Sequence, residues 1–387
     1  KEPDGNIKGR IRNIDIKASE IETDSIKLQH IIPFRMGNLN VTIDSAMFQI
    51  NEFTQINLGD IHYELQDEVL RMHNFSVGFT EDWVKVSKRI GVQKDLISAY
   101  VQELKLVELA TSSEFYSNLD LVAKKLEVIG LDLKVRKNKN YERPPDVYKP
   151  MFKGMVDLIP LQLDVDSILI TDSRISYEEL GKDKKHSAEI SFQKVEGSIT
   201  GLTTFEEEQK QRQEFVANLN AELYNSGKMK IKLTVPYEED RFELISDMGS
   251  MPMEDFNALA IPMAAVQIDS GQLKQLHFKM NANKHSAYSH LTMDYTGLHL
   301  TLIKETEDHK IRKQGFLTSV ANSAIRPNNL PSGKKYLTAS YTTERNVYRA
   351  PFQYIVMGVV DGATRIIPGK TVQSFIHKDK KKKKNKN

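Results

Sequence analysis

Histidine, serine and aspartate side chains gather between residues 277 and 299, where the chain offers the most potential for chemistry. The histidines there are His277, His285, His290 and His299. His285 and His290 lie five residues apart with no carboxylate at a fitting spacing, which favours ordinary surface histidines over zinc ligands. Alternation places His290 and Asp294 on one strand face, so a triad with Ser286 can be drawn, but nothing supplies an oxyanion site. The segment therefore predicts no catalytic centre.

The remaining chemical motifs are also weak. Asp164, Asp166 and Asp172 alternate with apolar residues, which favours a solvated strand face over a calcium site, and no EF-hand spacing is present. Glycine-rich phosphate loops, G-x-S-x-G and H-E-x-x-H are absent from the sequence. The absence of cysteine excludes thiol catalysis, cysteine-ligated zinc and disulfides. We expect a protein that is not an enzyme and that needs no cofactor or metal.

Three runs between Val266 and Ile303 place an apolar residue at every second position, as strands with one dry and one wet face do. Together they predict an antiparallel meander with one apolar face. The alternating residues, besides Tyr295, are Leu276, Phe278, Met280, Leu291, Met293, Leu298, Leu300 and Leu302. This face either lines a groove for a ligand or forms a closed core beneath helices, and the pattern leaves both possibilities open.

Strand patterns dominate the rest of the chain. Strands are expected over residues 11–21, 39–43, 48–53, 58–65, 70–79, 161–170, 174–179, 188–202, 216–224 and 229–235. Residues 96–109 fit a helix or a strand, and we favour a strand. Residues 126–135 predict a long strand with a kink near Gly130, which we interpret as a bulge. Without strand–helix alternation, the pattern predicts a large, mostly antiparallel sheet and excludes a doubly wound nucleotide-binding fold.

Few helices are expected. The clearest are 252–265, which Pro262 should end or kink, and 348–367, with Pro351 near its start. Shorter ones are expected over 112–120 and within 315–329, and residues 205–213 form either a solvated loop or a short exposed helix. No run of about 18 apolar residues could span a bilayer.

Charge is unevenly distributed along the chain. The net charge is +2, and residues 378–387 hold seven lysines and one aspartate, or +6, so the other 377 residues sum to −4. A nucleic-acid-binding body is therefore not expected. The tail residues Lys380, Lys381, Lys382, Lys383 and Lys384 either form a solvated terminus or contact anionic lipid head groups, where each lysine contributes about 1 kcal/mol. The helix expected upstream of them is either a cap on the sheet or an interfacial membrane helix.

Several segments, in their order along the chain, resemble the AsmA-like family of bacterial envelope proteins. Between about residues 90 and 370 these segments are LISAYVQELKLVEL, SSEFYSNLD, LVAKKLEVIGLDLKVRKN, ERPPD, PLQLDVDSILITDSRISYEE, FQKVEGSITGLT, MEDFNALAIPMAAVQIDSGQL and MDYTGLHL. The resemblance implies a mainly β fold, an elongated, twisted antiparallel sheet curled into a half-pipe or groove with a few capping helices. We expect an N-terminal β-groove segment over 1–140, a proline-rich charged loop over 141–160, a C-terminal AsmA-like β domain over 161–370 and a polybasic tail over 371–387.

The same resemblance implies a periplasmic protein that is anchored to the inner membrane by an N-terminal helix absent from this sequence. It also implies a role in outer-membrane integrity and phospholipid traffic. The eight alternating residues from Leu276 to Leu302 are then the expected contacts for a phospholipid or another envelope lipid, whose buried methylenes contribute about 0.8 kcal/mol each. The alternative is an envelope scaffold that binds another protein through the sheet edge or the groove.

Overall fold

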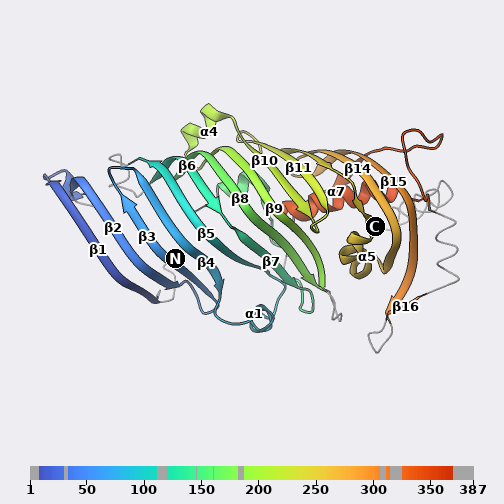
Figure 1. Cartoon of the computed structure of the whole chain (residues 1–387), viewed down its shortest axis with the longest axis horizontal. Helices are drawn as coiled ribbons and strands as arrows, with labels where there is room; N and C mark the ends of the chain where they lie inside the picture. Colours follow the sequence, from blue (N-terminus) through green and yellow to red (C-terminus); the bar gives the residue numbers. More distant parts are fainter. Residues whose placement is uncertain are drawn as a thin grey trace.

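One elongated, twisted β-sheet makes up most of the molecule (Figure 1). The computed structural model describes residues 8–29, 34–110, 120–144, 146–159, 161–181, 187–305, 311–313 and 325–368. Its strands are β1 (Lys8–Glu22), β2 (Arg35–Gln49), β3 (Thr54–Glu64), β4 (Val69–Phe79), β5 (Asp95–Leu109), β6 (Leu121–Ile129), β7 (Asp132–Asn138), β8 (Leu163–Leu180), β9 (Ser187–Thr203), β10 (Glu214–Leu223), β11 (Gly227–Pro236), β12 (Phe242–Met248), β13 (Met251–Pro252), β14 (Val266–Ala282), β15 (Ser286–Glu305), β16 (Ile311–Lys313) and β17 (Ala339–Glu344).

Neighbouring strands of the sheet follow the order of the sequence. The strands from β1 to β5 pair antiparallel in turn, and β5 then pairs with both β6 and β7. The strands β6 and β7 pair in parallel with β8, across the segment 141–160 that we expected to be a loop. From β8 the antiparallel order continues through β9, β10, β11, β12, β14 and β15 to β17. The predicted mainly β, mostly antiparallel sheet is confirmed.

The strands β6 and β7 are the two halves of one bent strand. Gly130 lies between them with φ 68°, and a Cβ at this position would lie 2.9 Å from Cβ of Gln102. A positive φ beside close packing is a position that glycine adopts without strain. The kink predicted near Gly130 is therefore confirmed, as is the strand predicted over residues 96–109, which is β5. The kink is not a bulge, because the register with β5 and with β8 continues across Gly130 without a shift.

The meander predicted from Val266 to Ile303 contains two long strands, β14 and β15, rather than three. The second and third apolar runs both belong to β15, and Gly297 with φ 66° lies between them. The register between β14 and β15 shifts at several points before Gln275. The change of alternation between Tyr295 and Leu298 is thus an irregularity within one strand, not a turn. The third strand of this part of the sheet is β17.

The helices are short, except for one. They are α1 (Trp83–Ile90), η1 (Lys27–Gln29), α3 (Phe152–Val156), α4 (Glu206–Arg212), η2 (Met253–Phe256), α5 (Asn257–Ala264) and α7 (Pro351–Ile366). The predicted helix 348–367 is confirmed as α7, and the short helix considered within 205–213 is α4. Residues 252–265 divide into β13, η2 and α5. Helix α5 ends two residues after Pro262, in agreement with the prediction that this proline ends or kinks the helix. The helix expected over 112–120, most of the one within 315–329 and the lysine tail lie outside the described residues.

The main hydrophobic core lies at the C-terminal end of the sheet, where β14 and β15 arch around α7 and α5 (Figure 1). The buried residues of α7 form one stripe at helical spacing: Pro351, Tyr354, Gly358, Gly362 and Ile366. At the N-terminal end, no helix within the described ranges lies over β1 to β4 (Figure 1). None of the described helices is both long enough and apolar enough to cross a bilayer.

Candidate functional site

Cross-strand pairing joins apolar residues into one continuous row across the sheet, from β1 to β17. Residues directly opposite each other on paired strands project from the same face. We call these residues the central row: Ile14, Ile43, Ile61, Met72, Leu104, Val128, Ile170, Gly197, Leu219, Ile231, Ser246, Phe278, Leu291 and Ala339. Only Gly197 and Ser246 interrupt its apolar character.

A second apolar row accompanies the central row through β2 to β9. It consists of Phe48, Ile56, Val77, Ala99, Leu133, Ile175 and Phe192, and we call it the flanking row. Each of these side chains is half-buried. Members of the two rows lie five residues apart on each strand, which regular alternation would place on opposite faces. Positive φ at Asp60, Asn74, Asp172 and Lys194 changes the phase between the rows on β3, β4, β8 and β9. Both rows therefore give one face of the sheet an apolar surface several residues wide.

The two ends of the central row differ in burial. Ile14 is 53% exposed, and the row members from Ile43 to Ile170 are half-buried. Phe278 is 1% exposed and Leu291 is fully buried. We call the central row from Ile14 to Ile170, with the flanking row from Phe48 to Ile175, the open face. Phe192 is left out because its ring packs against Phe352 of α7. The difference arises because the described helices α3, α5 and α7 cover the C-terminal part of the sheet and none covers β1 to β4.

The residues predicted to contact lipid lie at the covered end. Leu276, Phe278, Met280, Leu291, Met293 and Leu298 are buried, and Leu300 and Leu302 are half-buried. Helix α7 lies directly on this region, since a Cβ at Gly358 would lie 3.1 Å from Cζ of Phe278. The Tyr341 hydroxyl on β17 donates a 2.6 Å hydrogen bond to the Gly358 carbonyl. In this structure these side chains form a closed core, so lipid contact there would require α7 to move away. The tail residues Lys380 to Lys384 lie outside the described residues.

The open face was not singled out from the sequence. Isoleucines in residues 11–21 and apolar residues in 70–79 were visible as strand signals. The missing information was the register, which places Ile14 in one row with Met72 and Ile170. That row becomes visible only when the partner of each strand is known.

The side chains considered for a triad have other partners. His290 Nδ1 lies 2.8 Å from Ser340 Oγ. Asp294 is buried and accepts hydrogen bonds from the Tyr336 hydroxyl at 2.8 Å and from Gln275 Nε2 at 3.1 Å. Asp294 therefore acts as an acceptor that joins loop and strand. Within the described ranges, no cluster of three or more histidine, aspartate or glutamate residues could hold a metal ion.

The aspartates considered for calcium binding are divided between two environments. Arg212 of α4 contacts Asp164 and Asp166, each at 3.0 Å. Burial raises the pKa of Asp164, and the neighbouring Arg212 charge opposes that shift. Asp172 is exposed further along β8, with φ 47°. The arginine thus occupies the position that a cation would take between the first two carboxylates.

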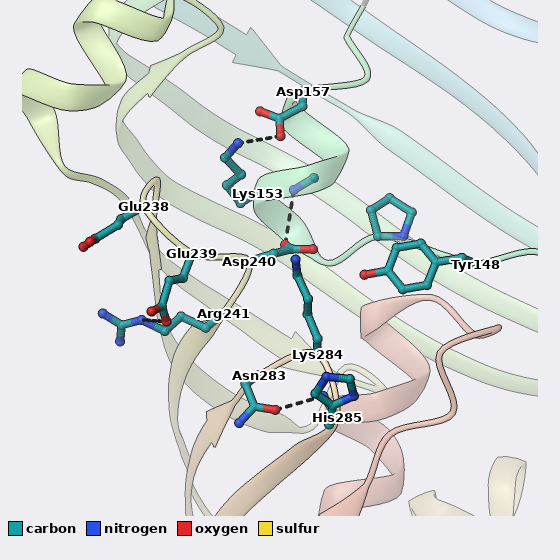
Figure 2. Close-up of a pocket in the computed structure, with 12 residues that line it drawn as sticks. Tyr148, Lys153, Asp157, Glu238, Glu239, Asp240, Arg241, Asn283, Lys284 and His285 are labelled. Carbon is teal, nitrogen blue, oxygen red and sulfur yellow. Dashed lines mark hydrogen bonds and ion pairs between the residues drawn. The ribbon is translucent and has the colours of Figure 1, made fainter.

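A polar cleft of about 610 Å³ lies beside α3 (Figure 2). Asp240 accepts hydrogen bonds from the backbone N–H groups of Met151 and Gly154, each at 3.2 Å, and so fixes α3 to the loop before β12. Lys153 contacts Asp157 at 2.6 Å, and in the same cleft Arg241 pairs with Glu239. The contacts of Asp240 hold α3 in place, and Glu238, Lys284 and His285 also line the cleft.

No model of a known protein family matches this chain, and no curated protein sequence matches it. The resemblance to the AsmA-like family stays a prediction based on the segments quoted above.

Proposed function

We propose that this chain is a non-enzymatic protein of the bacterial envelope that binds lipid acyl chains along its open face and supports their movement between membranes. The observation that carries the proposal is the central row, which stays apolar and accessible from Ile14 to Ile170. Exposed apolar surface of this extent marks interaction sites in soluble proteins.

The dimensions of the open face suit an acyl chain. Its central row crosses seven strands, and six spacings of about 4.8 Å give a length of about 29 Å. Aliphatic side chains hold methylenes without directional hydrogen bonds, at about 0.8 kcal/mol for each methylene buried. Neighbouring positions of the row are chemically alike, so a bound chain can shift along it without a large change in free energy.

The opposite face of the same strands is polar, which restricts lipid contact to one side. On β5 and β6, the residues next to the central row are Lys105 and Glu127, whose charged atoms lie 3.5 Å apart. A hydrogen bond from Lys125 at 2.7 Å lowers the pKa of Glu127 and keeps it charged. Charged pairs of this kind favour water on that face and leave the apolar face as the binding surface.

Location and partners belong to the same proposal. The resemblance to AsmA-like proteins supports a periplasmic position, with attachment to the inner membrane and a phospholipid or related envelope lipid as the ligand. The described residues bear on this only through the chemistry of the open face.

The proposal is tested by measuring lipid that co-purifies with the protein, using native mass spectrometry after gentle extraction. Met72→Asp places a charge in the central row on a half-buried position, and it is expected to remove most bound lipid while the melting temperature changes little. The matched control is Arg71→Asp, an exposed neighbour on the same strand, which should retain lipid. Phe278→Asp should instead unfold the closed end, since it buries a charge in the core.

Two outcomes would contradict lipid binding at the open face. One is wild-type protein without any co-purifying lipid. The other is equal lipid retention in Met72→Asp and Arg71→Asp.

A scaffold function is the second candidate, and one observation favours it. One edge of strand β1 has no partner strand among the described residues, so it could add a strand from another protein. Photocrosslinkers along the open face discriminate between the two functions, since lipid adducts support the first and a protein adduct supports the second.

A further inference from the structure

The N-terminal edge of the sheet is long, and no other element within the described residues covers it. Strand β1 spans 15 residues, every one of them exposed, and among the described residues it pairs only with β2. Its apolar side carries Ile11, Ile14, Ile16 and Ile21, which are 45 to 61% exposed. Soluble proteins usually protect such edges with proline, shortening, inward charges or a covering element. The opposite edge has such protection, because β17 is only six residues long and α7 covers its apolar side.

The sequence of β1 is complementary to itself. We infer that β1 pairs antiparallel with β1 of a second copy of this chain, with Ile16 facing Ile16 on the two-fold axis. In this register every charged residue from Arg10 to Glu22 faces a residue of opposite charge, and every isoleucine faces another apolar residue. These pairs are Arg10 with Glu22, Ile11 with Ile21, Arg12 with Glu20, Ile14 with Ala18, and Asp15 with Lys17. Apolar pairs and opposite charges directly across a pair of strands stabilise a sheet.

The backbone irregularities of β1 select the same register. The apolar positions change phase between Ile11 and Ile14, and again between Ala18 and Ile21, near Asn13 (φ 47°) and Glu20 (φ 55°). An axis through Ile16 places one phase change opposite the other, so the isoleucines of both copies stay on the same face.

Neighbouring registers lose these matches. An axis through residue 15 would place Asp15 opposite Asp15 and Ile11 opposite Ser19. An axis through residue 17 would place Lys17 opposite Lys17 and Ile14 opposite Glu20. Like charges directly opposite each other destabilise a sheet. The sequence of β1 therefore favours one register, with the axis through Ile16, as well as a second copy of the chain as the partner.

The resulting dimer has one continuous sheet. The open faces of the two copies lie side by side at its centre, and the ends covered by α7 lie outermost. Since the interface is isologous, it closes after two copies and uses the β1 edge of each copy. This inference goes beyond lipid binding and holds whether or not a lipid occupies the open face.

Cysteine crosslinking tests both partner and register, because the chain contains no cysteine of its own. Sedimentation equilibrium of the full chain should first give twice the mass of one copy. Ile16→Cys should then form an intermolecular disulfide, since residues directly opposite across antiparallel strands lie within disulfide reach. Ile14→Cys, of similar exposure on the same face, should crosslink poorly because it faces Ala18, and Ile14→Cys combined with Ala18→Cys should crosslink well.

A charge swap gives an independent measurement. Arg10→Glu should weaken dimerisation about tenfold, because two opposite-charge pairs become like-charge pairs. Adding Glu22→Arg in the same chain should restore the wild-type dissociation constant, while Arg71→Glu on an interior strand should leave it unchanged. A wild-type chain that stays monomeric at tens of micromolar, or Ile14→Cys that crosslinks as fast as Ile16→Cys, would overturn the inference.

Discussion

The close contact between α7 and the sheet should depend on Gly362 much more than on Gly358. A Cβ at Gly362 would collide with the Tyr341 hydroxyl and would lie 2.6 Å from Cδ2 of Leu291, both on the sheet beneath. A Cβ at Gly358 would meet Phe278 at 3.1 Å, with its next neighbours at 3.6 Å. We therefore compare Gly362→Ala with Gly358→Ala as a matched pair within one helix.

The magnitude follows from three contributions to the free energy of unfolding. Alanine in place of glycine stabilises a helix interior by about 1 kcal/mol. Overpacking at residue 362 costs about 1–3 kcal/mol, and displacing Tyr341 weakens its hydrogen bond to the Gly358 carbonyl, worth about 1 kcal/mol. Gly362→Ala is thus expected to destabilise the protein by about 2 kcal/mol. At residue 358 the packing cost is small, so Gly358→Ala should be neutral or stabilising by up to about 1 kcal/mol.

Urea denaturation followed by far-UV circular dichroism measures the global effect, and amide hydrogen exchange in residues 351–366 measures the local one. For Gly362→Ala, exchange in α7 should be about 30-fold faster than in the wild type, which corresponds to 2 kcal/mol at a factor of ten for every 1.4 kcal/mol. Equal stability and equal exchange in the two alanine variants would refute the conclusion that α7 is held at this distance by Gly362.

Further predictions concern one cap, one buried amide and one buried phenol. Asp82 accepts a 2.9 Å hydrogen bond from the first turn of α1, so Asp82→Ala should cost about 1 kcal/mol in unfolding followed by the fluorescence of Trp83, and an unchanged midpoint would contradict this capping role. The buried Asn329 amide bonds three backbone groups at 2.8 to 2.9 Å, so Asn329→Ala should cost about 3 kcal/mol in thermal unfolding, whereas a loss under about 1 kcal/mol would show that water replaces it. Burial raises the pKa of Tyr295 to about 12, so the folded state keeps a proton that the unfolded state loses near pH 10. The contribution of Tyr295 to stability is therefore complete below pH 10 and falls as the pH rises towards 12. The absorbance of tyrosinate at 295 nm measures this titration. A Tyr295 that ionises with an ordinary pKa while the protein stays folded would contradict the prediction.

Local periodicity was sufficient to predict most individual elements. The strand β5 was distinguished from a helix by its alternation, and the kink at Gly130 was predicted from one glycine within an apolar run. The same reasoning gave a wrong prediction at Gly297, where we expected a turn between two strands. A change of alternation at a glycine fits such a turn as well as an irregularity within one strand. Only the pairing of β15 with β14 on both sides of Gly297 separates these cases.

The candidate site was harder to predict because it depends on contacts between distant segments. Each strand contributes a single residue to the central row, so the row has no signature in any one window of sequence. Phe278 and Leu291 were recognised because their strands alternate cleanly, yet clean alternation is equally typical of a closed core. Their burial was decided by α7, which is far away in the sequence and was expected as either a cap or a membrane helix.

What covers the central row differs between its ends, and this difference argues for a ligand at the open one. At the closed end, helix packing removes Phe278 and Leu291 from water, and each such side chain contributes about 1.5–3 kcal/mol. The described strands from β1 to β4 have the same apolar composition without a helix, so their side chains forgo most of that contribution. An acyl chain along the row could supply it without changing the sheet, whereas a second copy along the edge of β1 would supply backbone pairing at that edge alone. The first covers the face and the second covers the edge, so the two proposals are compatible, and each can fail without the other.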